Sequence, residues 1–150
     1  MLEFDHVAGK RRHVSWLVHK GAPPARLHEE IARCEVVCAN CHRMRTAARA
    51  GWRRLAPEGD ELEWRSARVE RNVRFAYRVL EASGCADCGE RRLTVLDFDH
   101  VDGKESDVLR LAWNEAGLAR LEAEIARCEV RCANCHRRRT HAARLGAEGA

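Results

Sequence analysis

Residues 34–43 read CEVVCANCHR, and residues 128–137 read CEVRCANCHR. A second pair of segments repeats at the same offset, because LEFDHV at residues 2–7 returns as LDFDHV at residues 96–101. One shift of about 94 residues aligns both pairs without a gap, which indicates an internal duplication. The repeated Asp, His and Cys residues are types that bind metal ions and transfer protons. We therefore interpret the chain as two copies of one metal-dependent unit.

Length and cysteine content restrict the class of protein. The chain has 150 residues, so two copies leave units of roughly 50 to 70 residues, a size at which bound metals often supplement a small core. No apolar run is long enough to span a bilayer, and the acidic residues near the N-terminus argue against a secretory signal, so we expect a cytoplasmic protein with no membrane partner. In a reducing cytoplasm the eight cysteines favour zinc binding over disulfides.

Arginine side chains gather after each Cys-His motif, although the formal net charge is only +4. Guanidinium groups suit bidentate contacts with phosphates, so these segments predict a nucleic-acid partner, most simply DNA. A solvated helix face is the alternative interpretation. The arginines are Arg43, Arg45, Arg49, Arg53 and Arg54 after the first motif, and Arg137, Arg138, Arg139 and Arg144 after the second.

Periodicity and turn residues predict an α+β fold that is mostly helical outside short strands in each copy. Expected strands are at residues 2–7 and 93–101, with brief extended pieces at Val36, Val37 and Val130. Expected helices are at residues 27–34 and 121–128, and from each Cys-Ala-Asn-Cys-His segment to Gly51 or Gly146. Residues 57–60 predict a loop, and residues 64–83 an amphipathic helix ended by Gly84. The resulting domains are a partial first repeat over 1–55, a linker and helix over 56–84, and a complete unit over 85–146.

The second copy contains two Cys-x-x-Cys pairs, Cys85 with Cys88 and Cys132 with Cys135. Two such pairs, separated by an insert that can fold, supply four thiolates in tetrahedral geometry. This pattern predicts a structural zinc ion. Two further cysteines stand four residues before the second pair of each copy, and we interpret them as small apolar core residues rather than ligands; they are Cys34 and Cys128.

Asp99 and His100 end a predicted strand, and His136 directly follows the last cysteine of the zinc pairs. Phosphodiester hydrolysis requires a nucleophilic water, a base and a cation, and an Asp with a neutral His can hold a cation while a second His acts as the base. Neighbours on a strand point to opposite faces, so Asp99 and His100 converge only where the strand ends or a turn re-aims them, which Gly103 permits. A surface turn pair, and a three-cysteine, one-histidine zinc site, are the alternatives.

Together these segments resemble the HNH endonuclease family, many of whose bacterial and phage members bind zinc through two Cys-x-x-Cys pairs. The resemblance covers residues 64–143 well and residues 2–48 in part, and its motifs are residues 85–88, 96–101 and 132–137. It implies duplicated, zinc-stapled ββα-metal (His-Me finger) units that cleave DNA in the cytoplasm of a bacterial or phage-infected cell, with magnesium or manganese as the catalytic cation.

The resemblance also implies residue roles. His100 is the general base, and Asp99 and His136 bind the catalytic cation. The middle asparagine of the family has no match at residues 126–128, so Asn134 is the nearest candidate. Arg137, Arg138, Arg139, Arg43 and Arg45 are expected to contact DNA. The alternative function is a non-catalytic, zinc-stapled nucleic-acid-binding module.

The first copy carries only part of this set. Asp5, His6 and His42 match the catalytic residues, and Cys38 and Cys41 match the second cysteine pair, but counterparts of the first pair would precede the printed start. Three explanations for the missing pair remain open. The start of the sequence is recorded too late, the first copy is a degenerate remnant, or its site is completed by another chain. We expect activity in the second copy, and leave open a homodimer or an intramolecular pseudo-dimer.

Overall fold

The computed structural model describes residues 2–51 and 64–148, with side chains described as far as residue 143 and at Leu145. The predicted loop at residues 57–60, and the arginines Arg53 and Arg54, lie outside the described residues. The chain divides into two compact units, Met1–His42 and Arg43–Ala150. Within the described residues it is an α+β protein with seven α-helices and two two-stranded antiparallel sheets. Among these helices none combines the length and apolar character needed to cross a membrane.

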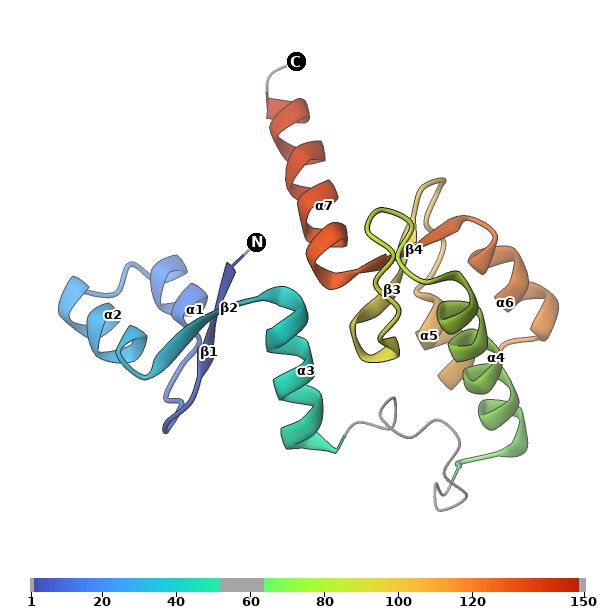
Figure 1. The fold of residues 1–150 in the computed structure, drawn as a ribbon, viewed down its shortest axis with the longest axis horizontal. Helices are drawn as coiled ribbons and strands as arrows, with labels where there is room; N and C mark the ends of the chain where they lie inside the picture. The colour runs from blue at the N-terminus through green and yellow to red at the C-terminus, as the bar shows by residue number, and fades with distance from the viewer. Residues whose placement is uncertain (1, 52–63, 149–150) are drawn as a thin grey trace. The chain divides into compact units, whose positions relative to one another are not determined.

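The first unit is one hairpin with two short helices between its strands. In β1 and β2, Leu2 lies opposite Cys38 and His6 opposite Cys34. The chain passes from β2 directly into a basic helix, α3 (Figure 1). Apolar burial in this unit centres on Val14 and Leu17 of α1. The elements are β1 (Leu2–His6), α1 (Val14–His19), α2 (Pro24–Ile31), β2 (Cys34–Cys38) and the start of α3 (Ala39–Ala50).

The second unit repeats this order and adds a long helix before it. In β3 and β4, Leu96 lies opposite Cys132 and His100 opposite Cys128, and β4 leads directly into α7 (Figure 1). The elements are α4 (Ala67–Ser83), the 3-10 turn η2 (Leu93–Val95), β3 (Leu96–His100), α5 (Val108–Trp113), α6 (Leu118–Ile125), β4 (Cys128–Cys132) and α7 (Ala133–Glu148).

Helix α4 contributes one side of the core of the second unit. Its apolar stripe is fully buried at Val69, Val73 and Leu80, and it packs against α5. The Ser66 hydroxyl caps the helix by accepting a hydrogen bond from the Val69 N–H at 3.2 Å. Gly84, with φ of 64°, ends it in a conformation that a glycine adopts without strain. The predicted amphipathic helix is confirmed, beginning three residues later than expected.

Several predicted bounds are wrong. The helices expected at residues 27–34 and 121–128 lie three residues earlier, because Cys34 and Cys128 begin strands paired with His6 and His100. The brief extended pieces are full five-residue strands. The strand expected at 93–101 begins as η2 and extends only from Leu96 to His100, and α7 continues through Gly146. The short helices α1 and α5 were not predicted.

Candidate metal centre and acid–histidine site

Four thiols of the second unit converge on one point. The sulfurs of Cys85, Cys88, Cys132 and Cys135 all lie within 4.8 Å of one another, and Cys88 Sγ is 3.8 Å from Cys132 Sγ. Two thiolates bound to one tetrahedral zinc ion at about 2.3 Å are separated by about 3.8 Å. The cluster therefore fits a structural metal such as zinc, as the spacing of the cysteine pairs predicts.

Backbone and arginine groups surround these sulfurs. Burial opposes ionisation of Cys85, but the backbone amides of Cys132, Cys88 and Asp87 outweigh it and lower the pKa of this thiol to about 7. Burial raises the pKa of the Cys135 thiol to about 12, and Arg138 donates a hydrogen bond to Cys135 Sγ at 3.0 Å. Donors directed at sulfur stabilise the thiolate, which is the form that binds zinc.

The other four cysteines do not join this cluster. Cys34 and Cys128 each donate from the thiol to a backbone carbonyl of the preceding helix at 3.3 Å. Both are partly buried, and Cys128 packs against the edge of the core, as expected for a core residue. In the first unit the Cys41 N–H donates to Cys38 Sγ at 3.4 Å. This pair forms a half-site, and Cys41 is exposed.

Two carboxylates of β3 lie close to His136. Because side chains alternate along a strand, Asp97 and Asp99 occupy the same face. His136, in the first turn of α7, lies 3.4 Å from Asp99 Oδ1 through Nε2 and 4.0 Å from Asp97 Oδ2 through Nδ1. Asp97, followed by Asp99, raises the pKa of His136. Two ligands about 2.1 Å from a shared ion are separated by about 3.0–3.4 Å, so Asp99 and His136 can share a divalent cation.

Asp99 is buried and is also held by two guanidinium groups. Its Oδ2 accepts hydrogen bonds from Arg131 at 3.0 Å and from Arg139 at 2.9 Å. Arg139 donates to the His100 carbonyl oxygen as well, at 3.2 Å. Oδ1 therefore faces His136 while Oδ2 faces the arginines, which fixes the carboxylate plane. The sequence assigned Arg139 to DNA contact and gave no role to Arg131.

His100 points to a different partner, Glu124 of α6. His100 Nε2 is 2.8 Å from Glu124 Oε1, which also accepts the N–H groups of Glu105 at 3.1 Å and Ser106 at 2.9 Å. The Ser106 amide, with His100 and Glu105, lowers the pKa of Glu124 against the effect of burial. Sequence analysis did not identify Glu124. The repeat contained the signal, because Glu30 occupies the same position in the first copy.

The three residues assigned to catalysis line one cavity of about 380 Å³. Its carboxylates are those of Asp97, Asp99 and Asp107, and His100, at the end of β3, is also among its lining residues. The structure thus places Asp99, His100 and His136 around a common space. Asn134 lies half-buried in the first turn of α7, one residue before Cys135.

The first unit reproduces most of this arrangement. His42 Nε2 lies 3.6 Å from Asp5 Oδ1, and His42 Nδ1 lies 2.5 Å from Glu3 Oε2. His6 Nε2 lies 2.8 Å from Glu30 Oε1, matching the pair formed by His100. One difference is that Val37 occupies the position of Arg131. The half-site of cysteines therefore accompanies a complete acid–histidine group.

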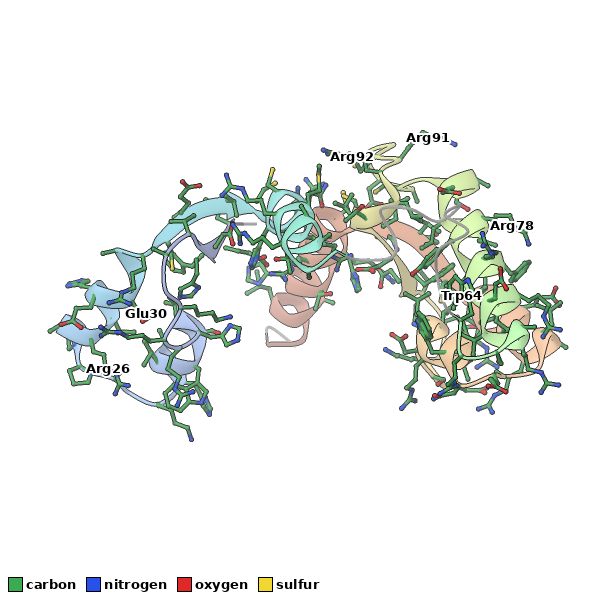
Figure 2. All side chains as sticks on the ribbon, turned by 90° about the horizontal axis from the view of Figure 1, so that it is seen from below. Arg26, Glu30, Trp64, Arg78, Arg91 and Arg92 are labelled. Atoms are coloured by element: carbon green, nitrogen blue, oxygen red, sulfur yellow. The ribbon has the colours of Figure 1, made fainter. Side chains whose placement is uncertain are left out.

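Arginines cover much of the second unit. Arg137 and Arg138 are exposed on α7, and Arg78, Arg91 and Arg92 project outward (Figure 2). In the α3 segment Arg43 and Arg45 are partly buried.

Comparisons of the chain with protein-family models, curated proteins and solved structures found no match.

Proposed function

We propose that the chain is a metal-dependent HNH-type endonuclease that hydrolyses phosphodiester bonds of DNA, built from two ββα-metal units. The observation that carries the proposal is the 3.4 Å approach of His136 Nε2 to Asp99 Oδ1 beside a cavity that His100 also lines. A DNA-binding surface needs no such group. The four-thiol cluster at the junction of β4 and α7 would hold a structural zinc ion that fixes the start of the helix carrying His136.

Each residue has a distinct chemical task in this proposal. Asp99 Oδ1 and His136 Nε2 would hold a divalent cation such as magnesium or manganese. Such a cation, when bound, polarises the phosphate and neutralises charge on the leaving oxygen. His100 takes a proton from the attacking water, whose oxygen bonds to phosphorus as the P–O bond to the leaving oxygen breaks. Arg137, which is exposed on α7, contacts a phosphate of the bound DNA.

The second candidate is a zinc-stapled nucleic-acid-binding module without catalysis. Arg131 and Arg139 support it, because two guanidinium groups already compensate the charge of Asp99 without any cation. This function predicts salt-dependent DNA binding with no strand cleavage at any cation concentration.

Nicking of supercoiled plasmid in a magnesium and manganese series distinguishes the two candidates. His100→Ala should reduce nicking by about 10²- to 10⁴-fold, the usual contribution of a general base. Zinc content should stay unchanged, because His100 lies outside the four-thiol cluster. His141→Ala, at an exposed position of α7, is the matched histidine control and should cleave as wild type.

Double changes assign the activity to a repeat. Loss of nicking in Asp99→Ala/His100→Ala, with nicking retained in Asp5→Ala/His6→Ala, would place it in the second copy. Wild-type protein that binds one zinc ion and DNA but never nicks would reject the nuclease function in favour of the binding module.

A further inference from the structure

We infer that Glu124 is a positioning residue for His100, whose buried carboxylate fixes the imidazole in the tautomer that presents Nδ1 to the attacking water. The inference rests on the proposed function, because the base role of His100 belongs to it. Glu124 itself does not line the cavity and acts only through the histidine ring.

The hydrogen-bond pattern determines the tautomer. Glu124 Oε1 accepts two backbone N–H groups, from Glu105 and Ser106. Backbone amides can only donate, so an oxygen that accepts both of them is not the one carrying a proton. The 2.8 Å contact between this oxygen and His100 Nε2 therefore requires Nε2 to be the donor. In the neutral ring the lone pair is then on Nδ1.

This assignment leaves a single nitrogen for chemistry. In the described part of the chain, residues 2–51 and 64–148, the His100 ring hydrogen-bonds through Nε2 to Glu124. His100 is also a lining residue of the cavity that Asp99 and His136 share. A carboxylate behind the imidazole stabilises the positive charge that appears when the opposite nitrogen takes a proton, as in other orienting carboxylate–histidine pairs.

The first unit provides an independent occurrence of the same arrangement. Glu30 of α2, labelled in Figure 2, contacts His6 Nε2 at 2.8 Å through Oε1. The same oxygen accepts the N–H groups of Arg11 at 3.0 Å and Arg12 at 3.1 Å. Arg11 and Arg12 have side chains that differ from those of Glu105 and Ser106, but their backbone N–H groups occupy the equivalent positions of the repeat. The buried carboxylate is therefore paired with histidine in both surroundings.

Glu124→Gln tests the inference in the zinc-loaded full chain. Glutamine retains an oxygen that can accept all three hydrogen bonds but carries no charge. We expect kcat for plasmid nicking in manganese to fall by about 10- to 100-fold, the usual effect of losing an orienting partner. KM for DNA and the zinc content should change less than about twofold, within the scatter of independent surface changes. Glu122→Gln, on the exposed side of the same helix, is the matched control and should leave kcat unchanged.

Nitrogen-15 NMR of the histidine rings at one fixed pH gives a readout that does not depend on cleavage. The His100 signal, assigned by its loss in His100→Asn, should show hydrogen on Nε2 in wild type, and Glu124→Ala should move it toward the Nδ1–H form. A wild-type Nδ1–H ring, an unchanged kcat in Glu124→Gln, or a raised KM with unchanged kcat would each overturn the inference. A wild-type chain with the Nε2–H ring and no nicking would reject the nuclease function while retaining the tautomer assignment.

Discussion

Replacing one cysteine in each copy tests the metal centre most directly. Cys135 and Cys41 occupy equivalent positions of the repeat, but Cys135 is buried among four thiols and Cys41 is exposed in a half-site. Serine is nearly isosteric with cysteine and is a poor zinc ligand. Cys135→Ser should therefore remove the zinc ion, whereas Cys41→Ser should retain it.

The size of the effect follows from the loop that the metal closes. Cys88 and Cys132 are 44 positions apart, and cross-linking a loop of that length removes about 4 kcal/mol of unfolded-state entropy at 25 °C. At about 4–8 °C per kcal/mol for a small domain, losing this cross-link should lower the melting temperature of the second unit by about 15–30 °C.

The assay combines zinc per chain with thermal unfolding, with and without chelator. Wild type and Cys41→Ser should bind one zinc ion, and chelator should lower their melting temperatures. Cys135→Ser should lack zinc, and chelator should leave its melting temperature unchanged. Equal zinc content and melting temperature in Cys135→Ser and wild type would refute a four-thiolate site, as would an equal loss of zinc in both variants.

Three other changes follow from the structure. Leu80→Ala removes a fully buried side chain of α4 and should lower the free energy of unfolding by about 2–5 kcal/mol, measured in denaturant. The pKa of His136 is raised by Asp97, so protons compete with the cation for this ring below that pKa. The manganese concentration needed for half-maximal nicking should therefore rise by up to about tenfold per pH unit as the pH falls. Asp97→Asn should shift this rise to lower pH. Arg137→Gln should weaken DNA binding and reduce the slope of log binding constant against log salt concentration by about 0.9. Arg120→Gln, at an exposed position of α6, is the control and should change neither. Equal slopes in the two variants would contradict a phosphate contact by Arg137.

Local spacing predicted the features that depend on residues near one another in sequence. The two Cys-x-x-Cys pairs predicted the four-thiol cluster, because two cysteines three residues apart can bring both sulfurs to one point. Helix α4 was also predictable, since its apolar stripe is long and Gly84 ends it. The meeting of His136 with Asp99 was expected from the family resemblance, and the structure places them 3.4 Å apart.

Features that depend on tertiary pairing were not predictable. Helix α5 has six residues, too few for periodicity to show, although Asp107 caps it by accepting the Arg110 N–H at 3.0 Å. Glu124 was missed because a glutamate on an amphipathic helix usually belongs to its polar face, whereas this one is buried by its bonds to His100 and two amides. The contact of Arg131 with Asp99 crosses from β4 to β3 and depends on strand register.

The three consecutive arginines of α7 cannot act as one basic patch. Successive residues on a helix are turned by about 100°, so three in a row project around most of its circumference. Arg138 reaches the Cys135 sulfur, Arg139 reaches Asp99, and Arg137 is exposed. A count of positive charges would assign the run three equivalent phosphate contacts. Its angular distribution instead directs Arg138 to the four-thiol cluster and Arg139 to a carboxylate, so substitutions at neighbouring positions should produce unrelated defects.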